Sequence, residues 1–392
     1  MASALITNSP DLSRLRAEDY EMAVRSGLLV ISNVPYLNAA GEIVRGVLVS
    51  PLSLSTPSKT GKPENHVVHF SGSPPCELDG TEMTGLGRHG SEQKLLEGLT
   101  VNFSFSNKPT DGYPDYYQKM TRYIDVISAP AKAKDPTVSA RTAGFKVSED
   151  AESPLVYIDT NSSRALITAV SEKLKGQRIA IVGLGGTGAY VLDSVAKTPV
   201  AEIHLFDDDD FRLHNAYRSP GAPLLAELES VPNKVEYYQA IYSRLHKRVI
   251  PHVENLNEKN VGQLAGFSFV FVCIDVCPEK KAILDFLLAQ GIPFSDTGIG
   301  IFNVDQKLRG TVRTTTVTAA KRDHIDARIP MAGPGTNDYA TNIQISELNM
   351  LNAAMAVLRW KKLLGFYADE RREHHVTYTV ETNSLVSDEI GS

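Results

Sequence analysis

The sequence predicts an α/β fold in which a Rossmann-like, mostly parallel sheet is preceded by a smaller α+β domain. Apolar strand-like segments alternate with helical segments after about residue 160, and such alternation is typical of βαβ units with right-handed crossovers. A glycine-rich segment directly follows the first of these strands, and acidic residues follow the next. Both features are typical of the carboxyl edge of a parallel sheet, where doubly wound folds bind their ligands.

The first 145 residues are predicted to form the smaller α+β domain. Residues 10–33 have the spacing of a helix that runs into a short strand at Leu28–Ser32. Strand patterns then occur at Val44–Leu52, His66–Phe70 and Asn102–Ser106, and a helix pattern occurs at Tyr113–Ile127. The tyrosines of that helix fall on or near one apolar stripe, so we expect them to pack in a core.

A linker is predicted between the two domains. Residues 129–154 contain Pro130, Pro136 and Pro154, several lysines and an acidic run, with little apolar content. That composition is typical of an exposed connection. We therefore assign residues 1–145 to the N-terminal domain, 146–162 to the linker and 163–392 to the C-terminal domain.

The C-terminal domain is predicted to alternate between helices and strands. We expect helices at Ser163–Leu174, Gly188–Thr198, Val231–Leu245, Glu279–Gln290 and Asn342–Leu364. We expect strands at Arg178–Val182, Glu202–Phe206, Phe267–Ile274, Ile292–Asp296 and His375–Val380. The last helix is long and rich in Ala, Leu and Met, which predicts a core or dimer element.

Composition limits the classes of function. The 392 residues are 42% hydrophobic and carry a net charge of −6, which is ordinary for a globular protein and argues against general nucleic-acid binding. Neither a signal peptide nor a membrane span is recognisable in the sequence. The chain has only three cysteines, which suits a reducing compartment. We therefore expect a cytoplasmic protein that binds neither nucleic acid nor membrane.

The glycine-rich segment is a candidate phosphate-binding loop. It contains Gly183, Gly185, Gly186 and Gly188 between an apolar strand and a helix, where glycines let the backbone approach phosphate and the helix N-terminus offers free N–H groups. The same spacing, with Asp207 downstream, also fits a dinucleotide site. The loop alone therefore leaves open an NAD-dependent dehydrogenase, an ATP-using enzyme or a purely structural turn.

Charged residues after the second strand favour ATP. The segment contains Asp207 and Asp209, then Asn215 and Arg218, and Lys234 begins the next predicted helix. This is more charge of both signs than an adenosine-ribose site needs. ATP chemistry uses both signs, because a carboxylate can hold the ribose while cations offset the triphosphate charge.

A further carboxylate follows the third strand. Asp275 lies where that strand is predicted to reach the carboxyl edge of the sheet. A carboxylate at this edge is well placed to ligate Mg²⁺ beside the phosphates. The sequence therefore predicts ATP and Mg²⁺ as cofactors, with Asp275 as the metal ligand.

Taken in order and spacing, these residues resemble the pattern of the ThiF/MoeB and ubiquitin-activating adenylyltransferases. The resemblance implies that Asp207 binds the ribose and that Arg218 and Lys234 bind the phosphates. It also implies that Asn215 supports these contacts and that Asp275 lies at the magnesium. Arg164 stands where this family has an arginine that reaches the triphosphate of a partner subunit, which makes the chain a candidate homodimer.

Two departures from the family pattern concern cysteine. The chain lacks the paired C-x-x-C motifs of many zinc-binding members, and no cysteine follows Cys277 where thioester-forming members carry one. The reaction therefore stops at the acyl-adenylate, or a conjugating-enzyme partner takes the acyl group, or Cys76 does. Cys76 lies in a proline-rich turn, where an inert residue is the more ordinary interpretation.

The N-terminal domain carries a separate resemblance. The segments His66-x-x-His69-Phe and Asp115-Tyr-Tyr-x-Lys119 are similar to a domain of unknown function that is fused ahead of such adenylation domains in bacteria. This resemblance assigns no catalytic role. A metal held by the two histidines is disfavoured, because residues three apart on a strand face opposite sides.

The sequence thus predicts ATP-dependent adenylation of a carboxylate. The resemblance implies that this carboxylate is the C-terminal glycine of a ubiquitin-like protein, in a bacterial ubiquitin-like conjugation or sulfur-transfer pathway. Three alternatives remain open: a small-molecule or peptide carboxylate, an NAD-dependent dehydrogenase, and a non-catalytic binding platform. The intact Arg218, Lys234 and Asp275 argue against the last alternative.

Overall fold

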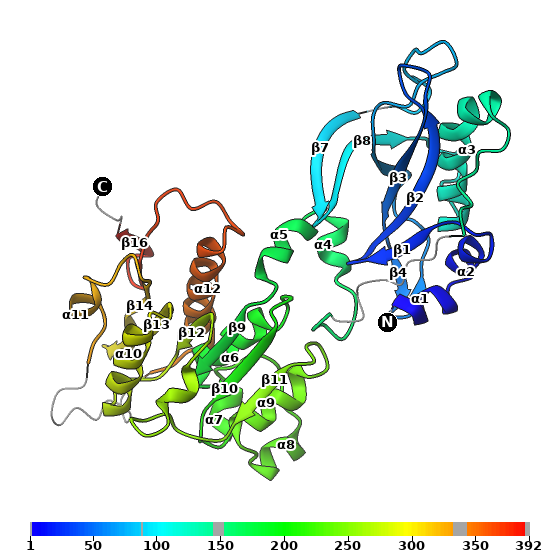
Figure 1. Cartoon of the computed structure of the whole chain (residues 1–392). Coiled ribbons are helices and arrows are strands. Elements are labelled where there is room, and N and C mark those ends of the chain that lie inside the picture. The colour runs from blue at the N-terminus through cyan, green and yellow to red at the C-terminus, as the bar shows by residue number, and fades with distance from the viewer. Residues whose placement is uncertain (1, 88, 144–152, 332–342, 389–392) are drawn as a thin grey trace. The chain divides into compact units, whose positions relative to one another are not determined.

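The computed structural model describes residues 2–87, 89–143, 153–331 and 343–388 (Figure 1). The chain divides into two compact units. The N-terminal unit comprises residues 1–153 and 157–172, and the C-terminal unit comprises residues 154–156 and 173–392. Residues 146–152 of the predicted linker lie outside the described residues. The segment 163–172, which the sequence analysis assigned to the second domain, packs with the first.

The N-terminal unit is built on an antiparallel sheet with the strand order β1-β2-β3-β6-β8-β7. The strands are β1 (Met22–Arg25), β2 (Leu28–Leu37), β3 (Ile43–Pro51), β6 (Val67–Ser71), β7 (His89–Leu96) and β8 (Leu99–Ser106), with a small separate hairpin β4 (Leu54–Thr56) and β5 (Lys59–Thr60). The helices are α1 (Ala2–Asn8), α2 (Pro10–Ala17), α3 (Tyr116–Lys134), α4 (Thr160–Arg164) and α5 (Thr168–Ser171).

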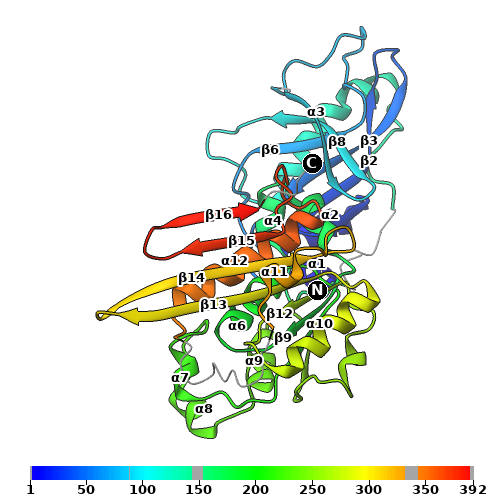
Figure 2. The ribbon, with the colours of Figure 1, turned by 90° about the vertical axis from the view of Figure 1, so that its left-hand side faces the viewer.

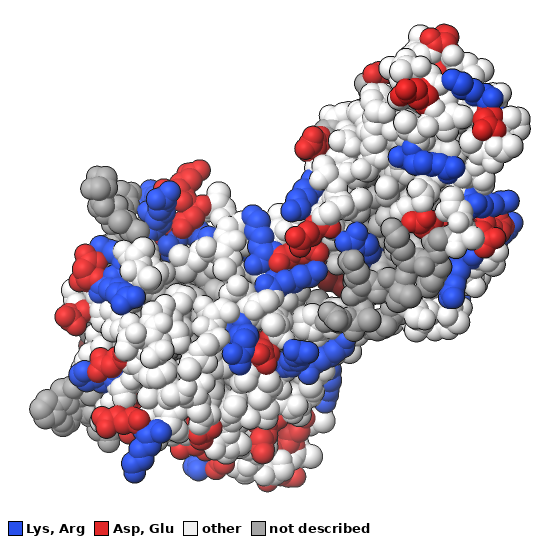
Figure 3. Space-filling view, viewed as in Figure 1, with Lys and Arg blue, Asp and Glu red and all other residues white. Residues whose placement is uncertain are grey.

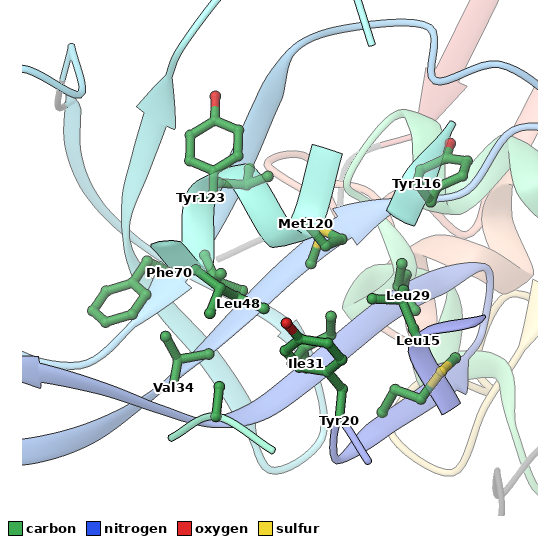
Figure 4. Close-up of a cluster of buried hydrophobic side chains, with 14 of the residues drawn as sticks. Leu15, Tyr20, Leu29, Ile31, Val34, Leu48, Phe70, Tyr116, Met120 and Tyr123 are labelled. Carbon is green, nitrogen blue, oxygen red and sulfur yellow. The ribbon is translucent and has the colours of Figure 1, made fainter. Parts of the chain in front are cut away.

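Helix α3 supplies one side of the core of this unit. Asp115 caps the helix by accepting a hydrogen bond from the backbone N–H of Gln118 at 2.7 Å, which satisfies one of the open donors of the first turn. Tyr116, Met120 and Tyr123 lie on its buried stripe (Figure 4) and pack with apolar side chains of the sheet. The predicted packing role of Tyr116 and Tyr123 is therefore confirmed.

The strand predicted at Leu28–Ser32 is present within β2, but the helix predicted ahead of it is wrong beyond its first turns. Helix α2 ends at Ala17, and the following residues form β1, in which Met22 and Val24 are buried while their neighbours are not. This two-residue alternation is typical of a strand that is buried on one face. Ser26 and Gly27 then take positive φ values of 46° and 78° in the turn to β2, which a helix could not accommodate.

The C-terminal unit contains an eight-stranded sheet with the order β11-β10-β9-β12-β13-β14-β15-β16. Its strands are β9 (Arg178–Val182), β10 (Glu202–Phe206), β11 (Val249–His252), β12 (Phe269–Val272), β13 (Phe294–Val304), β14 (Lys307–Val317), β15 (His375–Thr379) and β16 (Ser384–Asp388). The pairings from β11 to β13 are parallel, and those from β13 to β16 are antiparallel. The predicted fold class is confirmed.

Helices cover both faces of this sheet. They are α6 (Gly186–Val195), α7 (Leu213–Ala216), α8 (Leu225–Ser230), α9 (Lys234–Tyr242), α10 (Pro278–Gln290), α11 (Ile325–Arg328) and α12 (Ser346–Leu363). Helices α6, α9 and α12 share one core with residues of β9, β10 and β12, and α10 shares a second core with the alternate residues of β9 and β12. Alternate burial on two faces is what a doubly wound sheet requires.

Strand β14 and the hairpin that it forms with β13 were not predicted. The two strands pair from Phe294 with Val317 to Val304 with Lys307, and Figure 2 shows them beside β15 and β16. Asp305 and Gln306 make the two-residue turn with φ values of 50° and 60°. Turns of this kind are usually signalled by Asn-Gly or Asp-Gly, so Asp305 and Gln306 are only a weak local indication of this turn.

Two further predictions need correction. The helix predicted at Ser163–Leu174 is interrupted, because Leu166 takes a φ of 56° between α4 and α5. The strand at His375–Val380 is the last one that the sequence predicts. It is present as β15, but a further strand, β16, follows it in the sheet. Within the described residues, no helix is both long enough and apolar enough to cross a membrane.

Charge is mixed on the face shown in Figure 3, where acidic and basic side chains are interspersed on each unit. The whole sequence contains 40 Lys and Arg residues against 46 Asp and Glu residues.

Candidate functional site

The register of the parallel strands places several predicted site residues in one row. Val182 of β9 pairs with Phe206 of β10 and with Val272 of β12. The residues that follow these three are Gly183, Asp207 and Cys273. Because parallel strands end at the same edge, these residues lie side by side at the carboxyl edge of the sheet.

The glycine loop joins β9 to α6 and is shaped by close contacts. Gly183 has a φ of 88°, and a β-carbon added at Gly188 would overlap the carbonyl oxygen of Gly183. A β-carbon at Gly186 would overlap the side-chain amide of Asn349. Gly185 precedes the helix and has open space around its α-carbon. The N-terminus of α6 therefore presents its open N–H groups with little steric hindrance, as an anion site needs.

Asp207 and Lys234 form a buried network beside this loop. The backbone N–H of Leu184 donates to Oδ2 of Asp207 at 2.6 Å. Lys234 Nζ lies 2.6 Å from Oδ2 of Asp209 and 3.3 Å from Oδ1 of Asp207. Burial raises the pKa of Asp207, while the Lys234 ammonium and the Leu184 N–H act against that rise. The network therefore holds an ionised carboxylate against the start of the glycine loop.

The two aspartates differ in exposure. The side chain of Asp207 is 8% exposed, while that of Asp209 is 58% exposed. Asp207, Asp208 and Asp209 bring carboxylate oxygens within 4.8 Å of one another. Lys234 already places its positive charge on this cluster, so the ammonium supplies the charge that a metal ion would otherwise provide.

Asn215 and Arg218 lie on and after the short helix α7. Asn215 is buried and its Oδ1 accepts a hydrogen bond from the backbone N–H of Arg212 at 2.9 Å. Its carbonyl oxygen accepts from the backbone N–H of Arg218 at 3.1 Å. In the described part of the chain, the buried Nε of Arg218 has no hydrogen-bond acceptor. An unpaired guanidinium N–H of this kind is suited to bind an anionic oxygen.

Asn349 was not predicted as a site residue, although it connects three parts of the site. It lies on α12 and is fully buried. Its Nδ2 donates to the carbonyl oxygen of Arg218 at 3.2 Å, and its Oδ1 accepts from the hydroxyl of Thr187 at 3.0 Å. It also contacts Gly186. The available signal was an asparagine within a helix whose other buried positions are mostly apolar, namely Ala353, Ala356, Val357 and Trp360 beside Asn352 and Arg359.

The two remaining predicted residues are Asp275 and Arg164. Asp275 is half-buried and lies three residues beyond the end of β12, just before α10. Arg164 belongs to the N-terminal unit, where its Nε pairs with Oε2 of Glu64 at 2.8 Å. Asp275 is thus at the predicted edge of the sheet, while Arg164 is held by a carboxylate of its own unit.

A second charged cluster lies at the same edge and was also missed. Asp296 is fully buried on β13, one step along the row from Val272. Lys280 Nζ lies 2.5 Å from its Oδ1, and Arg313 Nη1 lies 2.8 Å from its Oδ2. The predicted strand ended at Asp296, and nothing in the sequence pattern joined it to Arg313 on the unpredicted β14.

The three cysteines are shielded. Cys273 lies in the row described above, and burial raises the pKa of its thiol to about 12. Cys277 is half-buried, and burial raises its pKa too. Cys76 is 1% exposed and its Sγ donates to the carbonyl oxygen of Pro74. A raised pKa keeps the thiols of Cys273 and Cys277 protonated near neutral pH, which makes them poor nucleophiles.

Comparison with protein families identifies both parts of the chain. A model described as "ThiF family" matches residues 160–386, which is more than half of the chain. The chain belongs to the ThiF family. A second model, "Domain of unknown function (DUF6791)", matches residues 10–160. The family resemblance inferred from the glycine loop and its downstream residues is thereby confirmed, and ThiF-family members are ATP-using adenylyltransferases.

A curated relative of this ThiF-family chain is the tRNA threonylcarbamoyladenosine dehydratase of Escherichia coli (strain K12). The two are 28% identical over 126 residues, which cover 31% of this chain and 45% of the relative. The match thus spans less than half the length of that relative.

Solved structures of E. coli MccB are also similar to this ThiF-family chain. The complex with MccA-N7isoASN is 16% identical, covers 59% of this chain and 72% of that chain, and has a TM-score of 0.48. The complex with ATP is 18% identical, covers 57% and 66%, and has a TM-score of 0.44.

Proposed function

We propose that this ThiF-family chain uses ATP to adenylate a carboxylate, and that the carboxylate is the C-terminal glycine of a ubiquitin-like protein. The observation that carries the proposal is the meeting of an open helix N-terminus with the Asp207–Lys234 network at one sheet edge. Asn349 further joins Arg218 to the same loop. Family membership supports the use of ATP.

Each part of the site has a role in this proposal. The glycine loop and the N-terminus of α6 bind phosphate through backbone N–H groups. Arg218 offsets phosphate charge, and its unpaired Nε supports that role. Asp207 and Asp209 bind the ribose, the more exposed Asp209 being the one with free carboxylate surface. Lys234 fixes both carboxylates and adds positive charge close to the phosphates.

The proposed reaction is a displacement at phosphorus. A carboxylate oxygen of the substrate attacks the α-phosphorus of ATP, and the bond from that phosphorus to the pyrophosphate oxygen breaks. The products are an acyl-adenylate and pyrophosphate. No general base is required, because the attacking carboxylate is ionised at neutral pH. Positioning and charge stabilisation then supply most of the rate acceleration.

Mg²⁺ fits this site through Asp275. A triphosphate carries more negative charge than Arg218 and Lys234 can offset, and a carboxylate at the sheet edge is a normal magnesium ligand. Asp275 stands at that edge, half-buried and three residues before the start of α10. Bound there, the ion would polarise phosphate oxygens and stabilise the departing pyrophosphate.

The proposal extends to partners. The raised pKa values of the Cys273 and Cys277 thiols and the burial of Cys76 support release of the acyl-adenylate to another polypeptide, such as a conjugating-enzyme partner. The burial of Cys76 also disfavours it as the acceptor. Arg164 acts on the triphosphate of a second copy in a homodimer, as the sequence resemblance implies. We place this activity in the cytoplasm.

A second candidate substrate is a small-molecule or peptide carboxylate. The observation that favours it is the curated relative, whose name describes action on a modified adenosine of tRNA. An NAD-dependent dehydrogenase is less compatible with the site. The family that the chain matches consists of ATP-using adenylyltransferases, and the two cations Arg218 and Lys234 suit a triphosphate.

ATP–pyrophosphate exchange tests the proposal. We expect exchange that depends on an added ubiquitin-like protein with a C-terminal glycine, and none with free small carboxylates. Arg218→Gln removes a positive charge from the phosphates and should lower the exchange rate by about 100-fold or more, and Asp275→Ala should do the same. Arg244→Gln, at an exposed position of the same unit, is the matched control and should exchange like the wild type.

The outcomes separate the candidates. Exchange with a short peptide or a small acid in place of the ubiquitin-like protein would transfer the proposal to the second substrate class. Full activity of Asp275→Ala would exclude Asp275 as the metal ligand. Tight NAD binding that Arg218→Gln leaves unchanged would contradict ATP chemistry at this site.

A further inference from the structure

The N-terminal unit contains a polar cavity, and the adenylation proposal uses only Arg164 of its lining. Its volume is about 380 Å³, within the lower range of small-ligand sites. The polar side chains that line it are Ser53, Glu64, Asn65, Lys119, Asn161 and Arg164. Lys119 comes from one of the two segments that carry the N-terminal resemblance, and Asn65 immediately precedes the other.

Lys119 is the buried member of this lining. Its residue is 1% exposed, and its Nζ donates to the hydroxyl of Ser50 at 2.9 Å. An ammonium group has three N–H donors, and among the described residues no carboxylate lies within ion-pair distance of Lys119. Its other contact is a long cation–π interaction, with the Tyr116 ring centroid 6.0 Å from Nζ. At least two donors of Lys119 thus have no protein acceptor in the described structure.

The surrounding charges do not compensate for this ammonium. The Arg164 guanidinium and the Glu64 carboxylate pair with each other at 2.8 Å on the cavity wall, so their charges cancel. Burial, together with the positive charge of Lys119, lowers the pKa of His69 of β6 to about 4. His69 is therefore neutral at pH 7. The cavity therefore holds one uncompensated positive charge whenever Lys119 is protonated.

The cavity mouth offers further polar groups. Asn65 and Asn161 are both exposed and both line the cavity. The Oδ1 of Asn65 accepts a hydrogen bond from the backbone N–H of Val67 at 3.0 Å. Its side-chain N–H₂ is therefore the group that can contact a ligand. Amide donors at the mouth and an ammonium at the buried wall suit a ligand that accepts hydrogen bonds and carries negative charge.

We propose that this cavity binds a small oxyanion group, a carboxylate or a phosphate, with Lys119 as its buried counter-charge. The ligand accepts hydrogen bonds from Lys119 Nζ and from side-chain amides at the mouth. The burial of a lone cation is unfavourable unless a partner neutralises it, and an oxyanion is the partner that this lining fits. Burial also lowers the pKa of Lys119 to about 7, and a bound anion would raise it again by favouring the charged amine.

The test uses the full-length chain with inorganic phosphate and with acetate as separate probes, each at constant ionic strength set with sodium chloride. Hydrogen exchange followed by mass spectrometry reports protection of α3 and of residues 160–165. We expect saturable protection by at least one probe in the wild type. The better probe identifies the ligand as a phosphate or a carboxylate.

Three variants make the test specific. Lys119→Met removes the charge but keeps the length of the side chain, and it should weaken binding by roughly tenfold or more, because a charge-assisted hydrogen bond is lost. Asn161→Ala leaves Lys119 in place and should weaken binding several-fold. Arg218→Gln lies in the other unit and removes a phosphate ligand of the proposed nucleotide site, so protection of α3 should persist in it.

The proposal is overturned if neither probe protects α3 beyond the effect of sodium chloride. It is also overturned if the folded Lys119→Met variant is protected as strongly as the wild type. Because the readout lies in the N-terminal unit and needs no ATP, its failure would leave the adenylation proposal untouched.

Discussion

Asn349 shows how one residue can hold a site together. Its amide bonds Thr187 at the start of α6 and the carbonyl oxygen of Arg218, and it fills the space that a side chain at position 186 would need. The glycine at 186 and the asparagine at 349 are therefore matched in shape. Neither residue can change without consequences for the other.

A double substitution tests this match. Gly186→Ala should lower the free energy of unfolding of the C-terminal unit by about 1–3 kcal/mol, because the new methyl group overlaps the Asn349 amide in a packed interior. Asn349→Ala makes room, so the double variant should lose less stability than the sum of the two single variants. Urea unfolding of the four proteins measures this coupling, and strict additivity would refute the match.

Lys119 gives a prediction for pH at the same scale. Its pKa in the folded protein, about 7, lies below its ordinary value of 10.5 because of burial. Between these values the unfolded chain holds a proton that the folded chain has released. The stability of the N-terminal unit should therefore rise with pH across this window, by up to ~1.4 kcal/mol per pH unit, and Lys119→Met should lack this contribution.

Labelling of Cys76 can measure this effect. The Cys76 thiol lies in the N-terminal unit, and the residue is 1% exposed. A short pulse of thiol reagent therefore labels Cys76 only in molecules in which that unit has opened. Urea midpoints at pH 7.5 and pH 9 should diverge between the wild type and Lys119→Met, in favour of the wild type at higher pH. Parallel midpoints at both pH values would mean that Lys119 titrates normally.

At the scale of elements, the site depends on strands that end at one edge of the sheet. Asp296 at this edge is a buried charge whose removal should lower stability. It is fully buried between Lys280 of α10 and Arg313 of β14. Removing its charge would leave two cations close together without a counter-ion. Buried pairs broken in this way lose much more stability than exposed pairs.

Asp296→Asn should therefore destabilise the C-terminal unit by about 3–5 kcal/mol. Asp285→Asn is the matched control. Asp285 pairs with Lys281 on the solvent side of α10, the helix that carries Lys280, and both side chains are more than half exposed. Its cost should stay below about 1 kcal/mol. Thermal unfolding of both variants checks the contrast, and equal costs would mean that the Asp296 cluster is hydrated.

Elements with strong periodic patterns could be predicted from the sequence. Strands β9 and β10 have their predicted bounds, and α10 differs by one residue at its start. Each is an apolar run or stripe bounded by charged residues or glycines, so local pattern and tertiary packing agree. The predicted site residues at the sheet edge follow from the same strands, because a strand end fixes where the next residue lies.

Features set by tertiary contacts could not be predicted. The turn at Asp305 and Gln306 adopts positive φ values without a glycine, so the pairing with β14 had little local signal. The break at Leu166 puts a leucine in left-handed conformation, which helical spacing cannot anticipate. Asn349 and Arg313 contribute through residues far away in sequence, such as Thr187 and Asp296, and no local pattern encodes such contacts.

At the scale of the whole molecule, the proposed homodimer makes a prediction about Arg164. If this arginine serves the site of a second copy, a chain with Arg164→Ala and a chain with Asp275→Ala should complement each other. Each mixed dimer would contain one site with both residues intact, and random pairing would restore about a quarter of the wild-type sites. ATP–pyrophosphate exchange after the two variants are unfolded and refolded together measures this recovery.

Each variant alone serves as the control and should show low exchange. Recovery on mixing would assign Arg164 to the partner's site. Full activity of Arg164→Ala alone would instead restrict Arg164 to its pairing with Glu64 in the N-terminal unit.

Trp360 makes the C-terminal unit optically distinguishable. It is the only tryptophan of the chain, it is 1% exposed, and it packs edge-on against Phe271 of β12 at a centroid distance of 6.0 Å. Its emission on excitation at long wavelength therefore comes from that unit alone, while the N-terminal unit contributes only tyrosine. Tryptophan fluorescence can thus record the unfolding of the C-terminal unit inside the intact chain. A blue-shifted emission band that persists while Cys76 becomes reactive would show that the two units unfold separately.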